Sequence, residues 1–169
     1  MSSPVKYFLG IDPGLSETGF GIIQSQNGEL SFVGCGIIKT PAKTDLAERL
    51  HTIKTDITEI LKSYPFSGVG LEELFFHKNV TNGIKVAQAR GVIVEKIFQF
   101  RYPTVEFTPL QVKHNICGYG GADKIQIQEM VKQLLHLDRR PKPYDAADAL
   151  AIAICAQRTF ENNTVLSFR

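Results

Sequence analysis

Tryptophan is absent from the 169-residue sequence, methionine is rare and long apolar runs are missing. No stretch reaches the roughly 18 apolar residues of a membrane-spanning helix, and the first residues lack the charged flank and apolar segment of a signal peptide. The three cysteines, Cys35, Cys117 and Cys155, are odd in number and far apart, which excludes a CxxC metal site. These features predict a protein of the reducing cytoplasm.

The composition is that of a globular protein, with 43% hydrophobic and 21% charged residues, and the length predicts one domain over residues 1–169. The net charge of +2 says nothing about partners by itself, but its distribution does. Residues 1–75 hold 6 basic and 9 acidic side chains, residues 76–142 hold 11 and 5, and residues 143–169 hold 2 and 3. A basic middle between acidic ends suits a polyanion held over a carboxylate site, and a solvated helical surface would give the same balance.

The first predicted strand carries the first candidate site residue. Tyr7 to Ile11 form a short apolar run, which is typical of a strand buried on both faces at the centre of a sheet. The run ends on Asp12, and Pro13-Gly14 then turns the chain. A carboxylate at the end of a buried strand is costly unless a partner compensates it, which indicates a site. A turn aspartate that bonds its own backbone is the alternative.

The following segments predict a meander and a helix. Residues 18–26 and 30–40 are strand-like and flank Asn27-Gly28, the strongest short hairpin signal, so the first three strands should pair antiparallel. Residues 44–63 repeat apolar side chains at spacings of three and four, which predicts a packing helix with Thr44 as its N-cap.

A short strand over residues 67–75 brings a second acid toward the first. Because it follows a helix, it should pair parallel to an earlier strand through a crossover, with its carboxyl end at the edge that holds Asp12. Ligand sites of open α/β sheets lie at that edge. The strand carries Glu72 and Glu73, and the pattern does not decide which of them faces the site.

The helix predicted over residues 82–101 has an unusually wide apolar surface. Its apolar side chains cover an arc of roughly 220°, whereas a surface helix needs only about 100°. The excess predicts burial on two sides. Either a second subunit covers the outer side, giving a homodimer, or the helix is enclosed within one domain.

The remaining segments predict a fifth strand and three helices. Residues 105–107 form the strand, residues 109–117 a helix capped by Thr108, and residues 122–137 a further helix after the Gly-Tyr-Gly-Gly break at 118–121. The last helix opens at Tyr144 and is rich in alanine.

Charged side chains flank the glycine break and open the last helix. Lys113, His114 and Lys124 lie beside the break, where cations on a flexible turn can approach a phosphate backbone. Asp145 and Asp148 are three residues apart in the first turn of the last helix and therefore share a face. Compensation of the helix dipole would also explain them, but small neighbouring side chains should bring this helix close to the sheet and both acids toward Asp12.

Four carboxylates thus become candidates for one site: Asp12, Glu72 or Glu73, Asp145 and Asp148. Like charges packed together demand a cation, and ligation by oxygen alone suits Mg²⁺ or Mn²⁺. Two such ions can activate a water and stabilise the leaving oxygen of a phosphodiester.

The motifs that carry these acids resemble the RuvC family of crossover junction endodeoxyribonucleases. The resemblance spans nearly the whole chain in order. It is carried by Leu9–Gly14, by Leu71–Asn79 with Gln88–Gly91, and by Asp145–Ala153, where some relatives have His at the position of Asp145.

The resemblance implies an α/β fold of the RNase H-like type, with a five-stranded mixed sheet flanked by helices on both faces. It also implies a homodimer that resolves Holliday junctions by paired symmetric nicks, uses two Mg²⁺ ions per subunit with Mn²⁺ as substitute, and works with the RuvA–RuvB branch-migration complex. The acids that match the family's catalytic and metal-binding positions are Asp12, Glu72, Asp145 and Asp148. The residues that match positions near the DNA are Phe75, Lys78, Arg90, Lys113 and Lys124.

Two other function classes compete with a resolvase. An actin-like nucleotide-binding module also begins with a strand, an aspartate and a glycine-rich hairpin, but this chain is too short for two such lobes. A non-catalytic junction binder would have a degenerate site, whereas all four acids are present here.

Overall fold

The computed structural model describes residues 3–74 and 80–161. Five strands form one mixed sheet in the order β3-β2-β1-β4-β5. The first three strands pair antiparallel, β4 pairs parallel to β1, and β5 pairs parallel to β4, which confirms the predicted sheet. The strands are β1 (Lys6–Asp12), β2 (Glu17–Gln26), β3 (Glu29–Lys39), β4 (Phe66–Glu72) and β5 (Thr104–Phe107).

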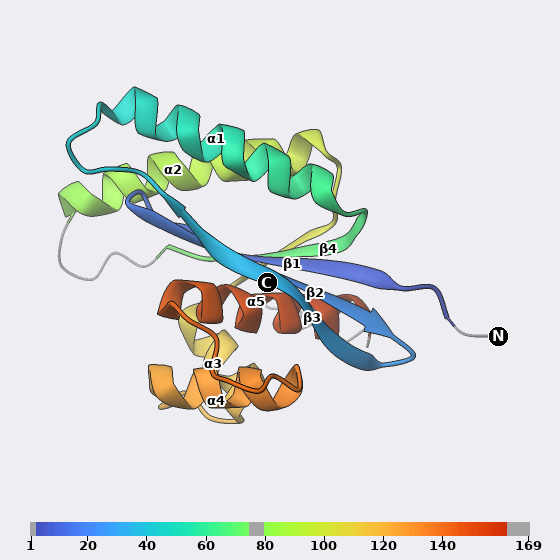
Figure 1. Ribbon diagram of the computed structural model, residues 1–169. Helices are drawn as coiled ribbons and strands as arrows, with labels where there is room; N and C mark the ends of the chain where they lie inside the picture. The colour runs from blue at the N-terminus through green and yellow to red at the C-terminus, as the bar shows by residue number, and fades with distance from the viewer. Residues whose placement is uncertain (1–2, 75–79, 162–169) are drawn as a thin grey trace.

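Helices cover both faces of the sheet (Figure 1). Helices α1 and α2 lie on one face, and α5 lies against the other with α3 and α4 beyond it. Two apolar clusters follow from this layering, one between the sheet and α1/α2 and one between the sheet and α3–α5. The helices are α1 (Leu46–Ser63), α2 (Val80–Gln99), α3 (Pro109–Cys117), α4 (Lys124–Leu134) and α5 (Tyr144–Glu161).

Three predicted helix starts are wrong. Helix α2 runs from Val80 to Gln99 rather than over residues 82–101, so both of its predicted bounds lie two residues too late. Helix α1 is preceded by Asp45 rather than Thr44 at the N-cap, and this cap makes no side-chain hydrogen bond. Helix α4 starts at Lys124 because Asp123 and Gln126 form a capping box in which each side chain accepts the other's backbone N–H at 2.8 Å.

The predicted ends of β4 and α4 also differ from the structure. Strand β4 stops at Glu72 rather than residue 75, because its pairing with β5 ends there. Helix α4 ends at Leu134 rather than residue 137, and His136 adopts a positive φ of 52° just beyond it.

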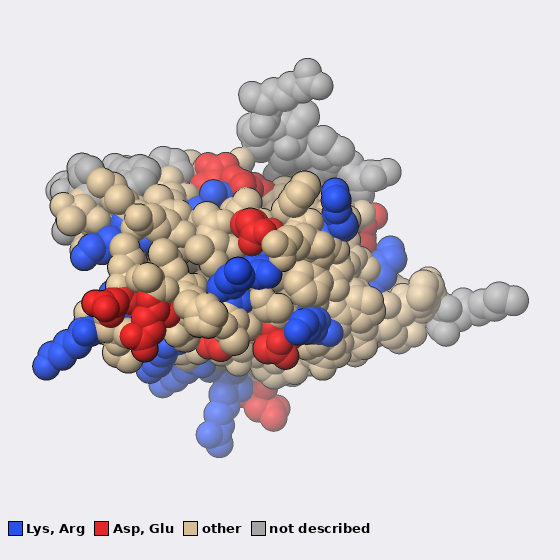
Figure 2. Space-filling model, turned by 90° about the horizontal axis from the view of Figure 1, so that it is seen from above, with Lys and Arg blue, Asp and Glu red and all other residues tan. Residues whose placement is uncertain are grey.

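Helix α2 buries only one of its apolar sides. Ala89, Ile93 and Ile97 join the cluster beneath α1, whereas Ile84 and Phe98 are 55% and 65% exposed. The alternative of a helix enclosed within one domain is therefore wrong. Figure 2, which looks onto the α1/α2 layer, shows acidic and basic side chains interspersed on this face rather than a field of one sign.

Among the described residues, no helix combines the length and the apolar character needed to cross a membrane.

Candidate active site

The pleat of β1 aims Asp12 at α5. Leu9 and Ile11 are fully buried in the cluster beneath α1 and α2. Because successive side chains of a strand point to opposite faces, Gly10 and Asp12 face the other way, toward α5. The sequence placed Asp12 at the end of a central strand, and the pairing of β1 with both β2 and β4 confirms that position.

The same rule decides between the two glutamates of β4. Leu71 packs in the α1/α2 cluster opposite Ile11, so the next side chain, Glu72, faces α5 beside Asp12. The carboxyl groups of Asp12 and Glu72 share a hydrogen bond. Glu73 lies beyond the strand, and its backbone N–H donates to the carbonyl of Phe107 at 2.8 Å.

Glycines in the sheet let α5 approach closely enough to deliver its acids. A Cβ on Gly10 would lie 1.9 Å from the carbonyl oxygen of Ala149, and one on Gly19 would lie 2.1 Å from that of Asp145. Neither contact is tolerable, so only glycine fits under this helix. The resulting close packing places the first turn of α5, with Asp145 and Asp148, over the end of β1.

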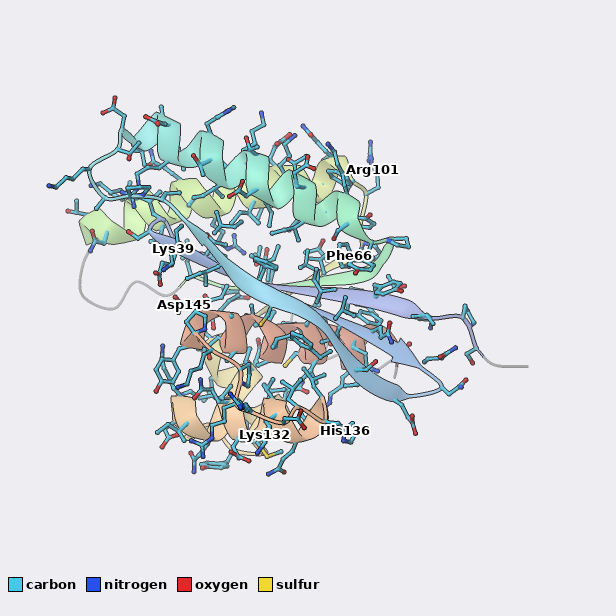
Figure 3. The ribbon with its side chains drawn as sticks, viewed as in Figure 1. Lys39, Phe66, Arg101, Lys132, His136 and Asp145 are labelled. Atoms are coloured by element: carbon cyan, nitrogen blue, oxygen red, sulfur yellow. The ribbon has the colours of Figure 1, made fainter. Side chains whose placement is uncertain are left out.

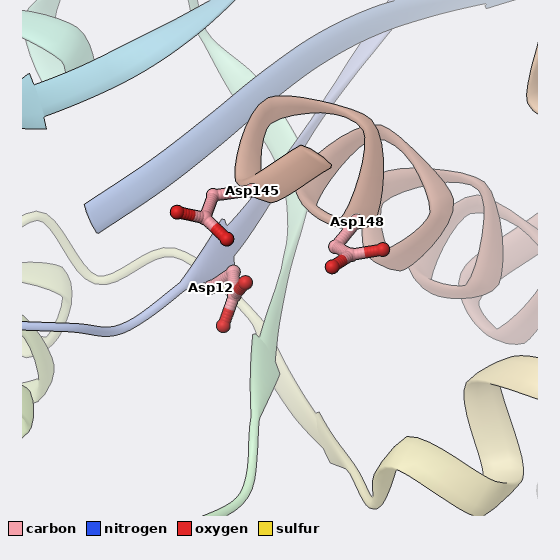
Figure 4. A group of neighbouring side chains, drawn as sticks. All are labelled: Asp12, Asp145 and Asp148. Carbon is pink, nitrogen blue, oxygen red and sulfur yellow. The ribbon is translucent and has the colours of Figure 1, made fainter. Parts of the chain in front are cut away.

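Three aspartates converge at this point (Figure 4). One carboxylate oxygen from each of Asp12, Asp145 and Asp148 lies within 4.8 Å of the others. Figure 3 shows Asp145 at the same end of the sheet as Lys39, with Phe66 at the opposite end. The predicted grouping of acids from β1 and α5 is therefore present, and Glu72 of β4 lies beside Asp12 in the same cleft.

Burial and mutual repulsion perturb all four acids. Burial, followed by the charge of Glu72, raises the pKa of Asp12 to about 9 from 3.8. Burial also raises the pKa values of Glu72, Asp145 and Asp148. With a pKa of about 9, Asp12 holds a proton at neutral pH, and a bound cation would have to displace it.

Two lysines face the acids from the α3–α4 region. Lys124 Nζ lies 3.8 Å from Asp148 Oδ2 and 5.5 Å from the ring centroid of Tyr144. Lys113 lines the same cleft, and its charge lowers the pKa of Asp148 against the larger effect of burial. Both lysines lie more than 20 residues from each of the acids in the sequence, so the fold brings them to the site.

Three of the four acids and both lysines line one cleft of about 280 Å³, whose walls include Asp12, Glu72, Asp148, Lys113 and Lys124. Carboxylates occupy its floor at the sheet edge, and the lysines reach it from the helices. This arrangement can hold a divalent cation against the acids and a phosphate against the lysines.

The donor set fits a hard divalent metal. Oxygen ligands from at least three carboxylates, close enough to share one ion, are the ligands that Mg²⁺ and Mn²⁺ prefer. A cation bound there would relieve the repulsion that Glu72 and the aspartates exert on Asp12.

The remaining predicted DNA contacts are less clear. Arg90 is held within the fold: its Nη2 lies 2.8 Å from Glu106 Oε2, and its Nε donates to the carbonyl of Glu72 at 3.4 Å. A role for Arg90 in DNA binding stays a prediction. Phe75 and Lys78 lie outside the described residues.

Glu17 is a site neighbour that the sequence analysis missed. It shares a hydrogen bond with Asp145 that raises the pKa of that aspartate, and it lies 3.5 Å from Lys39 Nζ. The hairpin signal could have found it, because a strand that returns antiparallel from the turn after Asp12 must begin at the edge that holds Asp12.

Comparison with known proteins identifies the family. The family described as crossover junction endodeoxyribonuclease RuvC matches residues 8–156. A protein of that name from Clostridioides difficile is 48% identical over 147 residues, covering 87% of each chain. One from Halothermothrix orenii is 46% identical over 155 residues, covering 92% of this chain and 94% of its own.

A solved structure agrees with the sequence relatives. Thermus thermophilus RuvC in complex with a Holliday junction substrate superposes with a TM-score of 0.83 at 31% identity, over 88% of this chain and 91% of its own. The fold, the clustered acids and the sequence relatives thus agree, and the chain belongs to the RuvC family of crossover junction endodeoxyribonucleases.

Proposed function

We propose that this chain resolves Holliday junctions by paired symmetric nicks during homologous recombination and DNA repair. The observation that carries the proposal is the cleft where Asp12, Glu72 and Asp148 face Lys113 and Lys124 in a chain that matches the family from residue 8 to residue 156. The products expected of such nicks are 5′-phosphate and 3′-hydroxyl ends, which a ligase can join.

The acidic and the basic residues of the cleft have different proposed roles. We assign Asp12, Glu72, Asp145 and Asp148 as catalytic residues that bind the metal. The partial burial of Asp12 and Glu72 at the sheet edge restricts their carboxylates, which favours a preorganised site. Two Mg²⁺ ions per subunit, with Mn²⁺ as a substitute, would supply an activated water and stabilise the charge on the leaving oxygen.

The lysines would hold the scissile phosphate over the acids. Lys113 and Lys124 approach from α3 and α4, on the side of the cleft opposite the sheet. Lys124 pairs with Asp148 at 3.8 Å, and its side chain is 62% exposed. An entering phosphate can therefore replace Asp148 as the partner of its ammonium group.

A homodimer would supply the two active sites that paired nicks require. The exposed apolar side of α2, with Ile84, Val94 and Phe98, supports this assembly. A neighbouring groove of about 450 Å³, lined by Val94, Phe98 and Arg101, would receive side chains of the second copy. Contact with the RuvA–RuvB complex and a cytoplasmic location stay predictions.

The first test is cleavage of a labelled four-way junction, with and without Mg²⁺, beside a linear duplex of the same sequence. We expect paired, metal-dependent nicks on the junction only. Cleavage of both substrates would retain the nuclease chemistry but remove junction selectivity.

The acids are tested by Asp148→Asn. This variant should lose cleavage and keep junction binding, because it removes a metal ligand without removing the lysines. Cleavage at the wild-type rate would refute the four-acid assignment.

The two alternative functions make different predictions. Tight junction binding without cleavage by the wild-type protein would favour a non-catalytic junction binder. The actin-like alternative lacks support, because the family match covers residues 8–156 and the relatives are named as endonucleases.

A further inference from the structure

A second basic cleft lies beside the turn that follows Asp12. It has a volume of about 470 Å³, within the range of ligand sites, and its walls include Gly14, Ser16, Arg49 and Lys85. The cleft is formed by the β1–β2 turn and the first turns of α1 and α2, so it is separate from the cleft that holds the acids.

Arg49 is a buried cation without an acidic partner in the described part of the chain. The residue is 7% exposed, yet it takes part in none of the ion pairs that the described residues form. Its Nε donates to Thr40 Oγ1 at 2.9 Å, and its Nη2 donates to Ser16 Oγ at 2.8 Å. Neutral hydroxyl groups satisfy these donors but do not balance the charge, and a buried unbalanced charge favours an anion.

The contacts of Arg49 also fix the turn that carries the cleft. Thr40 donates its hydroxyl to the carbonyl of Leu15, and its backbone N–H donates to the carbonyl of Ser16 at 3.0 Å. Arg49 therefore links the end of β3 to the turn after Asp12. A guanidinium held in this way is preorganised, so binding an anion costs little side-chain entropy.

Lys85 provides the second cation. It is exposed, and no acidic side chain among the described residues pairs with it. The acid on the cleft wall, Glu17, already lies 3.5 Å from Lys39. The cleft therefore has an excess of positive charge directed at whatever enters it.

The position of the cleft indicates which anion it takes. Gly14 follows Asp12 by two residues, a distance of at most about 7 Å along the chain. A DNA strand bound at the acids would therefore reach the cleft within a few nucleotides. We propose, resting on the resolvase function proposed above, that Arg49 and Lys85 bind a non-scissile phosphate of the cleaved strand.

The test measures junction affinity at several salt concentrations in the absence of divalent metal. The logarithm of the association constant falls with the logarithm of the salt concentration, and each lost phosphate contact makes this fall less steep. Lys85→Gln should reduce the magnitude of this slope by about 0.7–0.9 and weaken binding about fivefold to tenfold. Lys54→Gln, which removes an exposed lysine of α1, is the matched control.

Two variants of Arg49 separate charge from turn geometry. Arg49→Lys and Arg49→Gln both lose the guanidinium group that bridges Ser16 and Thr40, but only Arg49→Gln loses the charge. We expect the lysine variant to keep the wild-type salt slope and the glutamine variant to lose about one unit. Equal slopes in the two folded variants would assign Arg49 a structural role alone.

The proposal is overturned if Lys85→Gln keeps the wild-type affinity and slope, or if Lys54→Gln changes both equally. If the wild-type protein cuts junctions, either result would refute the phosphate site without contradicting the resolvase function. A wild-type protein that neither selects nor cuts a junction would refute the proposed function itself. If the Arg49 variants do not fold, the Lys85 and Lys54 pair still decides the question.

Discussion

Replacing Asp12 by asparagine should stabilise the metal-free protein while destroying its activity. Asp12 is half-buried beside Glu72, Asp145 and Asp148, and this burial, followed by the charges of these neighbours, raises its pKa to about 9. In the unfolded chain the same carboxyl titrates near 3.8. Folding at neutral pH therefore forces Asp12 to take up a proton, and Asp12→Asn removes that requirement.

The sign of the pH dependence follows from the raised pKa. The folded state binds the extra proton between pH 3.8 and about 9, so the wild-type protein loses stability as the pH rises through this range. At pH 7 the solution is about three pH units above the pKa of Asp12 in the unfolded chain. At about 1.4 kcal/mol per unit, protonating Asp12 on folding therefore costs at most about 4 kcal/mol of stability. The amide can still donate to Glu72 but fits the site less well, so we expect a net gain of about 1–3 kcal/mol.

The assay is thermal unfolding in EDTA at pH 5, 7 and 8. A gain of this size should raise the Tm by about 3–8 °C for a domain of this length. The difference between variant and wild type should increase with pH. Asp56→Asn, which makes the same change at an exposed position of α1, is the control and should show no such trend.

In Mg²⁺ the wild-type protein should instead be more stable than Asp12→Asn. A cation bound by the ionised cluster stabilises the wild-type protein by mass action, and the variant lacks one of its ligands. The reasoning is refuted if Asp12→Asn is no more stable than the wild type at pH 8 in EDTA, or if the difference between them does not change with pH.

Three further outcomes follow from the site and the fold. Lys113→Ala should slow single-turnover junction cleavage at least about tenfold, whereas Lys62→Ala on α1 should leave it unchanged; equal rates would remove Lys113 from the site. Gly10→Ala should destabilise the protein by about 2–4 kcal/mol in denaturant unfolding, because its Cβ meets the backbone of α5, whereas Gly34→Ala has open space and should cost far less. Phe98→Glu should shift a dimer to monomer in analytical ultracentrifugation, and an unchanged dimer would place the interface away from α2.

The sequence alone determined the sheet and the residue types of the site. The Asn27-Gly28 hairpin signal and the strand after the first helix predicted the antiparallel and parallel pairings, because turn chemistry and crossover rules are local. The acids at the ends of β1 and β4 and in the first turn of α5 were recognisable because buried strands and an alanine-rich helix rarely carry charge without a reason.

Where the sequence prediction failed, the deciding contact was usually more distant in the chain. The residue pattern left Glu72 and Glu73 open, and only the family resemblance indicated Glu72, because the choice depends on which face of β4 packs against α1 and α2. Strand β4 ended early because β5 ends beside it. The start of α4 is the exception, since the capping box of Asp123 and Gln126 is visible in the sequence and was overlooked.

Only the tertiary structure decided how the site is balanced electrostatically. It brought Lys124 to within 3.8 Å of Asp148 across 24 residues of chain, and it placed Glu17 against Asp145. It also paired Arg90 with Glu106 in an ion pair and buried Arg49 among hydroxyl groups. A sequence shows which charges a chain carries, but the energy of each charge depends on distance and burial, which exist only once the chain has folded.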